Sequence, residues 1–276
     1  MASQWERLLK NQGTWVGSFT QISPTGAVIQ ETPTEVALIP LQQGRTIRQE
    51  IRKQAPGQAS SETVLEYSSL GRGVLFCENG AFSQGSIQWS PVSEFGAELG
   101  LIEGPERLRL VQIFPRQPTL GSLTLIREAL AGISAPPRPR LTLDSLLGTW
   151  LGEAVTVYPD FQPEQSLGTR LEVQRLSQGD IHQTLSWGDS PSLASQAQQV
   201  GASLRFEGGR PPVTVLFLPG GATATFPTQI QPGQPFFLEM GWLINPDLRH
   251  RLIRSYNAQG TWVSLTLVVE HRQPTD

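Results

Sequence analysis

Short runs of alternating hydrophobic and polar residues fill most of the chain, and almost every run ends at glycine, proline or asparagine. Alternation with a period of two is typical of a β-strand that buries one face. One clear run places Arg107 and Arg109 on one face and Leu108 and Leu110 on the other. In the first half the pattern predicts strands over residues 14–21, 35–41, 46–53, 64–67, 74–77, 85–89, 94–102, 107–114 and 120–127.

Helix signals are confined to the start of each half. Ser3 and Glu6 have the spacing of a capping box before two leucines, which predicts a short helix over residues 4–11. Thr142 or Asp144 could begin the equivalent turn in the second half. Eight or nine short strands in each half, without a long helix, favour closed antiparallel up-and-down barrels, since closure removes exposed strand edges. An open sandwich is the alternative.

The chain repeats itself. The segment from Gly13 to Gly17, Gly-Thr-Trp-Val-Gly, returns as Gly-Thr-Trp-Leu-Gly from Gly148 to Gly152. Further matches keep the same order with small changes in spacing, as in a duplicated domain. Between the copies, residues 135–140 read Ala-Pro-Pro-Arg-Pro-Arg, a composition that favours an extended linker. We therefore predict two domains, residues 1–138 and 139–276.

Composition narrows the class of protein. Charged residues make up 16% of the 276 residues, below the roughly 25% of an average soluble domain, and there are 27 glycines and 22 prolines. The net charge of −3 includes no basic block, which argues against a nucleic-acid partner. The single cysteine, Cys77, cannot form an intramolecular disulfide, and no stretch has the length of a membrane span. We expect an intracellular protein.

A short helix, Gly-Thr-Trp at the start of the first strand and an antiparallel meander resemble the lipocalin and fatty-acid-binding-protein superfamily, the calycins. This resemblance implies two tandem lipocalin-like barrels, each preceded by a short helix. The whole chain is more similar to a two-domain lipocalin-like family of cyanobacteria and plastids with no assigned function, on segments 5–9, 65–70, 82–89 and 98–102. This second resemblance implies a cytoplasmic or plastid-stroma location. It also implies distant kinship with the bilin chromophore lyases.

The calycin resemblance also assigns structural roles. Gly13 with Trp15, and Gly148 with Trp150, would mark the barrel bases, where a large aromatic side chain usually serves as a packing plug. In lipocalins an arginine of the last strand packs across this tryptophan, and Arg127 matches that position. The second half has Val269 there, so Trp150 lacks a guanidinium unless Arg272 or another arginine reaches it.

Two repeated glutamates are candidate ligand contacts. Glu98 and Glu239 occupy equivalent positions in the middle of predicted strands, where glutamate is uncommon. A turn over residues 103–106 would bring Glu98 opposite Val111 and diagonal to Arg109, and the same folding would bring Glu239 near Arg251. These pairs would be ordinary surface ion pairs if they face outward, or polar groups inside an apolar cavity if they face inward.

Other matched positions differ between the halves. One half has Gln112 and Phe114 where the other has Arg254 and Tyr256, and Trp242 replaces a leucine. Since pockets are mostly apolar with few polar groups, we expect a ligand to contact these side chains. The complete candidate set is Gln49, Glu98, Gln112, Gln183, Glu239, Trp242, Arg254 and Tyr256.

Catalytic and metal signals are weak. Cys77 lies in an apolar strand, where a free cysteine is usually a small core residue rather than a nucleophile or a bilin carrier. The three histidines, His182, His250 and His271, have no spacing that suggests a metal site. The leading hypothesis is a non-catalytic binding protein for a tetrapyrrole, carotenoid or lipid, with no required cofactor. The alternatives are a bilin lyase-like chaperone acting on a phycobiliprotein, and an assembly factor that binds a protein partner such as a photosynthetic complex.

Overall fold

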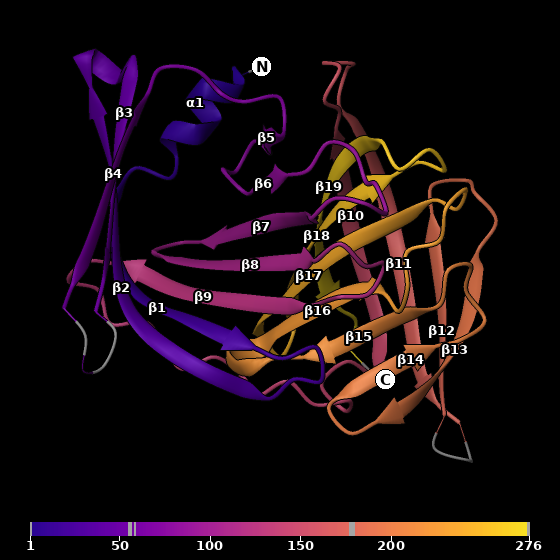
Figure 1. Cartoon of the computed structure of the whole chain (residues 1–276). Helices are drawn as coiled ribbons and strands as arrows, with labels where there is room; N and C mark the ends of the chain where they lie inside the picture. Colours follow the sequence, from indigo (N-terminus) through magenta and orange to yellow (C-terminus); the bar gives the residue numbers. More distant parts are fainter. Residues whose placement is uncertain (1, 55–56, 58, 177–179, 275–276) are drawn as a thin grey trace.

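The computed structural model describes residues 2–54, 57, 59–176 and 180–274. It is all-β and antiparallel, with one short helix at the N-terminus, α1 (Gln4–Leu9), so the predicted fold class is confirmed. Figure 1 shows two curved sheets packed side by side. The described residues contain no helix long and apolar enough to cross a membrane.

The first sheet contains β1 (Gly13–Ile22), β2 (Val28–Leu41), β3 (Thr46–Lys53), β4 (Ser61–Tyr67), β5 (Val74–Phe76), β6 (Phe82–Gly85), β7 (Phe95–Glu103), β8 (Glu106–Phe114) and β9 (Ser122–Leu130). Their order is β4-β3-β2-β1-β9-β8-β7-β6-β5. No ladder joins β4 to β5 within the described residues, so this sheet is a half-barrel rather than the closed barrel that the sequence predicts. The physical reason is that β5 has three residues and a loop separates it from β4.

Helix α1 spans part of this opening. Its N-terminus has the predicted capping box, in which Ser3 and Glu6 bond to each other's backbone amides. The Gln4 amide accepts from the backbone of Phe76 on β5 at 2.7 Å and donates to it at 3.0 Å. Trp5 donates to the Gly44 carbonyl oxygen before β3 at 2.5 Å. The helix thus connects β5, at one edge of the half-barrel, with the turn before β3.

The second sheet is a closed barrel of β10 (Gly148–Val157), β11 (Gln165–Arg175), β12 (Ile181–Trp187), β13 (Leu193–Val200), β14 (Ser203–Phe206), β15 (Val213–Phe217), β16 (Ala222–Pro227), β17 (Phe236–Asn245), β18 (Leu248–Tyr256) and β19 (Trp262–Arg272). Short 3-10 turns, η1 (Gln42–Gly44) and η2 (Pro219–Gly221), precede β3 and β16. β10 pairs with both β11 and β19, which closes the ring.

Two local predictions need correction. The helix expected before the second barrel is a single turn in which the Leu146 amide donates to the Leu143 carbonyl oxygen, because three residues are missing there relative to the first copy. The strand predicted over residues 85–89 is instead β6, three residues earlier, because Asn79 and Gly80 form a turn after β5. Gly80 has a φ of 92°, a conformation that glycine adopts without strain.

The outward faces of the two sheets form the largest core of the molecule. It contains Leu99 and Leu110 of the first sheet against Leu238 and Leu252 of the second, all fully buried. Arg138, within the proline-rich segment between the copies, lies over the Trp242 ring at 4.9 Å and donates to the Ile244 carbonyl oxygen at 2.9 Å. The interface therefore fixes one barrel against the other. The division near residue 138 stays a prediction.

Candidate functional site

Each sheet has a buried tryptophan at its base. The Trp15 indole donates to the Asn11 carbonyl oxygen at 2.9 Å, and the Trp150 indole donates to that of Leu146 at 3.0 Å. Arg107 lies over the Trp15 ring at 4.4 Å. These contacts have the geometry of structural plugs, stabilised by cation–π attraction.

Arg127 does not pack on Trp15, which corrects the role implied by the calycin resemblance. On β9 it shares a face with Leu123 and Leu125, which point outward into the interface, and it pairs with Glu31 at 2.7 Å. Alternation along the strand therefore directs its guanidinium away from the base.

Two guanidinium groups lie over the Trp150 ring. Arg249, which corresponds to Arg107 in the repeat, lies 4.7 Å from the ring centroid, and Arg272 lies 4.4 Å from it. Arg272 reaches the base from the last strand, as the sequence allowed, and donates to the backbone oxygens of Ser145 and Leu147. Trp150 therefore packs against arginine side chains although the second copy has Val269 where the first has Arg127.

The ion pairs predicted from the hairpin turns are present. Glu98 lies opposite Val111, and its carboxylate contacts Arg109 at 2.7 Å. In the second barrel the Glu239 carboxylate contacts Arg251 at 3.3 Å. Both pairs face inward, which settles the alternative between a surface pair and a polar group lining a cavity.

A second carboxylate completes each cluster, and the hairpin pattern in the sequence does not predict it. Glu128 on β9 accepts from Arg107 Nε at 2.8 Å and from Arg109 at 3.0 and 2.7 Å. Its counterpart Glu270 on β19 accepts from Arg249 Nε at 2.5 Å and Arg251 Nε at 3.0 Å. Burial alone would raise the pKa of each glutamate, but the neighbouring guanidinium groups outweigh it and hold both pKa values below the ordinary one.

The signal for these carboxylates was in the repeat. Glu128 and Glu270 are identical residues one position after the residues that the calycin comparison aligned, Arg127 and Val269. We define the two base clusters as Arg107, Arg109, Glu98 and Glu128 in the first sheet, and Arg249, Arg251, Glu239 and Glu270 in the second.

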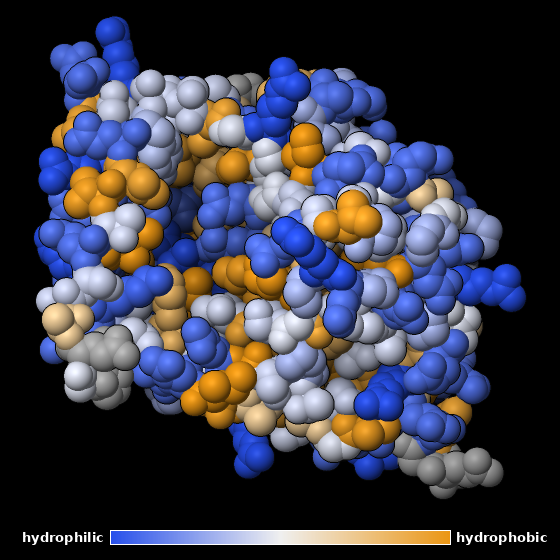
Figure 2. Space-filling view, viewed as in Figure 1, coloured by the Kyte–Doolittle hydropathy of each residue, from blue (hydrophilic) through white to orange (hydrophobic). Residues whose placement is uncertain are grey.

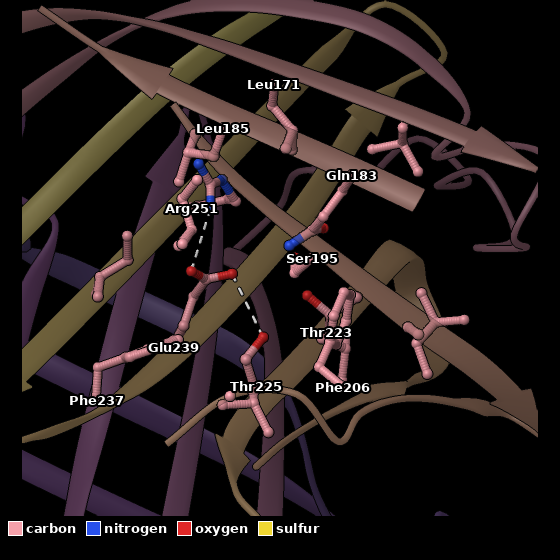
Figure 3. A pocket seen from close by; sticks show the side chains of 18 of the residues that line it. Leu171, Gln183, Leu185, Ser195, Phe206, Thr223, Thr225, Phe237, Glu239 and Arg251 are labelled. Atoms are coloured by element: carbon pink, nitrogen blue, oxygen red, sulfur yellow. Dashed lines mark hydrogen bonds and ion pairs between the residues drawn. The ribbon is translucent and has the colours of Figure 1, made fainter. Parts of the chain in front are cut away.

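The second barrel encloses a cavity of about 1470 Å³ that extends from its base cluster. Its walls are mixed. Apolar side chains include Leu171, Leu185, Phe206 and Phe237, and the polar ones include Gln183, Ser195, Thr223 and Thr225. Figure 3 shows Glu239 between Arg251 and Thr225, whose hydroxyl donates to it at 3.4 Å. Such a cavity is large enough for a drug-sized or larger amphipathic molecule.

The first half-barrel has a smaller cavity of about 790 Å³. Gln49 and Glu98 line it, together with Arg109 and Lys53. Figure 2 shows the surface hollowed between the β3–β4 edge and the short β5–β6 pair. Of the eight candidate ligand contacts, four therefore line cavities: Gln49, Glu98, Gln183 and Glu239.

The other four lie in the interface between the sheets, outside both cavities. Gln112 donates to the Glu239 carbonyl oxygen at 3.2 Å, and Trp242 packs against Arg138. Arg254 donates to Ser83 Oγ and the Ser86 carbonyl oxygen, each at 3.1 Å, and the Tyr256 hydroxyl donates to the same carbonyl at 2.9 Å. Successive side chains of a strand point to opposite faces of its sheet. On β8, β17 and β18 one face lines a cavity, so these four side chains lie on the other face, against the neighbouring sheet.

Cys77 is buried in the interface core, and burial raises the pKa of its thiol to about 12. That environment suits a core residue rather than a nucleophile. His182 lines the second cavity, whereas His250 is buried on the outward face, where burial lowers its pKa. Among the described residues no three His, Cys, Asp or Glu side chains come close enough to hold a metal ion.

Comparison with known structures decides the family. A crystal structure from Nostoc punctiforme, of a protein of unknown function from the DUF3598 family, is 45% identical over 99% of this chain and 100% of its own, with a TM-score of 0.94. The chain belongs to the DUF3598 family. The similarity to a cyanobacterial family without an assigned function, inferred from the sequence, is thus confirmed.

Two family models divide this DUF3598 chain between them. The DUF3598 N-terminal domain model matches residues 1–133, and the model "Biogenesis factor required for ATP synthase 1, C-terminal domain" matches residues 137–273. An S-type phycobiliprotein lyase from Guillardia theta is similar over 49% of this chain and 92% of its own, at 10% identity and a TM-score of 0.38. No curated protein matches.

Proposed function

We propose that this protein assists the assembly of ATP synthase by binding one of its components. One observation supports the proposal above others: residues 137–273, which include the whole second barrel, match the C-terminal domain of a biogenesis factor required for ATP synthase. The large apolar interface, with Arg254 hydrogen-bonded across it, is compatible with a rigid two-barrel surface for a protein partner.

The test is genetic and biochemical. Deleting the gene in its host should lower the amount of assembled ATP synthase on native gels, and the full-length chain should restore it. Tagged full-length protein should also recover ATP synthase subunits in stoichiometric amount. Unchanged enzyme levels together with no recovered subunit would contradict the proposal.

A second candidate is small-molecule binding in the second barrel, favoured by its cavity of about 1470 Å³ with mixed apolar and polar walls. The ligand would be an amphipathic molecule such as a tetrapyrrole, carotenoid or lipid. Protein purified from its host should then carry a ligand detectable by native mass spectrometry and absorbance. A Thr223→Trp variant, which fills the cavity, should lose that ligand, whereas Thr63→Trp on the exposed β4 strand should keep it.

Ligand-free protein that also fails to bind added apolar molecules would rule out this candidate. The related hypothesis of bilin delivery to a phycobiliprotein stays a prediction. Its test is whether the full-length chain accelerates bilin attachment over the spontaneous reaction.

A further inference from the structure

The two base clusters differ in how fully they use their hydrogen-bond donors. In the first sheet each side-chain nitrogen of Arg109 donates a hydrogen bond. Nε and Nη2 donate to the two oxygens of Glu128, and Nη1 donates to Glu98 at 2.7 Å. This bidentate arrangement is the strong form of an arginine–carboxylate pair. All three side-chain nitrogens of Arg109 are therefore engaged with carboxylates.

The equivalent arginine of the second barrel keeps a donor free. Arg251 contacts Glu270 through Nε alone and Glu239 through Nη1 at the longer distance of 3.3 Å. Its Nη2 group makes no hydrogen bond to any residue that the structure describes. One oxygen of the fully buried Glu270 also lacks a partner there, whereas both oxygens of Glu128 are hydrogen-bonded. The Nη2 group is unpaired in both Arg249 and its counterpart Arg107, so it does not distinguish the clusters. The second base cluster therefore has unused hydrogen-bonding capacity.

This capacity lies on the wall of a cavity that can hold a ligand. Arg251 and Arg249 both line the cavity of about 1470 Å³. Gln183 on β12 and Ser195 on β13 also line this cavity. In the ring, β12 and β13 are five strands away from β17 and β18, so these two polar side chains lie across the cavity from Glu239 and Arg251. Figure 3 shows the Arg251 and Glu239 side chains within this space. A ligand near the base would therefore lie beside the Arg251 guanidinium.

The charge of the cluster limits what that ligand can carry. Two guanidinium groups face two carboxylates, and the pKa of Glu270 is held low by those guanidinium groups against the opposing effect of burial, so the cluster is neutral as a whole. The remaining charged lining residues, Asp180, Arg205, Glu207 and Arg210, also balance. A buried ligand carboxylate would therefore add an uncompensated charge, which is costly away from water.

We propose that Arg251 is a specificity-determining residue that donates a hydrogen bond to an uncharged oxygen, a hydroxyl or a carbonyl, of an otherwise apolar ligand in the second barrel. This inference rests on the small-molecule function proposed above. In the first cavity the equivalent Arg109 has all three side-chain nitrogens engaged with carboxylates, so we expect the two copies to bind ligands differently although their ion pairs are repeated.

The test uses the full-length chain and three ligands with the same twelve-carbon chain: 1-dodecanol, 2-dodecanone and dodecanoate. Each competes with a neutral environment-sensitive dye, Nile red, at pH 7. The alcohol and the ketone should displace the dye at concentrations several-fold lower than dodecanoate. Arg251→Lys keeps the charge but removes the forked donor, and it should weaken alcohol binding about tenfold, as expected for one charge-assisted hydrogen bond. Arg127→Lys, at a partly exposed arginine outside both cavities, is the control and should leave alcohol binding unchanged.

The outcomes separate the two proposals. If Thr223→Trp abolishes dye binding but all three ligands compete equally, or dodecanoate competes best, the role of Arg251 is refuted while the cavity function stands. If neither the dye nor any ligand binds, the small-molecule function itself fails. The preference within the wild-type series requires no variant, so a folding defect in Arg251→Lys would not prevent the test.

Discussion

Arg107 covers the indole face of Trp15, with its guanidinium carbon 4.4 Å from the ring centroid and its Nε bonded to the fully buried Glu128 side chain at 2.8 Å. The same three residue types recur as Arg249, Trp150 and Glu270 in the second barrel. The duplicated feature is thus a tryptophan, an arginine and a glutamate that pack together at the barrel base, while the side chains that line the two cavities differ.

The first prediction concerns stability at this base. Arg107→Met should lower the free energy of unfolding by about 2 to 4 kcal/mol, because it removes the cation over Trp15 and one of the two guanidinium partners of the buried Glu128. Arg127→Met, the control, removes a partly exposed pair with Glu31 and should cost about 0 to 1 kcal/mol. Chemical denaturation followed by tryptophan fluorescence measures both. Equal losses would contradict the structural role of Arg107.

The second prediction concerns acid sensitivity. The pKa values of Glu128 and Glu270 are lower in the folded protein than their ordinary value of 4.5. The stability that these carboxylates contribute is therefore complete above the unfolded pKa and is lost as the pH falls through the folded one. Thermal melts from pH 7 downward should show a steep loss below about pH 4.5. Glu270→Gln should be less stable at pH 7 but should lose less on acidification, whereas Glu94→Gln, at an exposed site, should follow the wild type.

The third prediction concerns the interface. Arg254 is fully buried and donates to the Gly73 carbonyl oxygen, Ser83 and Ser86 across it. Arg254→Met should speed hydrogen exchange in β6 and cost about 2 to 4 kcal/mol, since several buried acceptors lose a charged donor. Tyr256→Phe removes one hydroxyl and should cost about 1 to 2 kcal/mol. Exchange in β6 that matches the wild type in Arg254→Met would contradict this account.

Hairpin geometry explains why part of the site was predictable. The turns before Glu106 and Leu248 fix the register of two adjacent strands, so the Glu98–Arg109 and Glu239–Arg251 pairs follow from counting residues. The repeated Glu128 and Glu270 lie on a third strand. Their contact with the arginines depends on which strand is the other neighbour of β8 or β18 and on which face each glutamate occupies.

Alternation also does not say what covers the outward face of a barrel. Arg254 and Tyr256 have the same period-two pattern whether water or another sheet lies outside them. A buried arginine on that face becomes understandable only with the backbone oxygens of the other sheet in place. The open edge between β4 and β5 could not be predicted from the hydrophobic pattern either, because strand length and loop position decide whether a ring of strands closes.

The last prediction concerns Cys77. Its thiol is 1% exposed and its pKa is raised to about 12 by burial, so at pH 8 almost none of it is thiolate. Iodoacetamide should therefore leave the native protein unmodified over hours and alkylate it within minutes in denaturant, as measured by intact mass. Arg254→Met, which loosens the interface containing Cys77, should give faster labelling than wild type, while Arg127→Met should not. Rapid labelling of the native wild-type chain would show that this part of the interface opens, and the thiol would then be available as a reactive group.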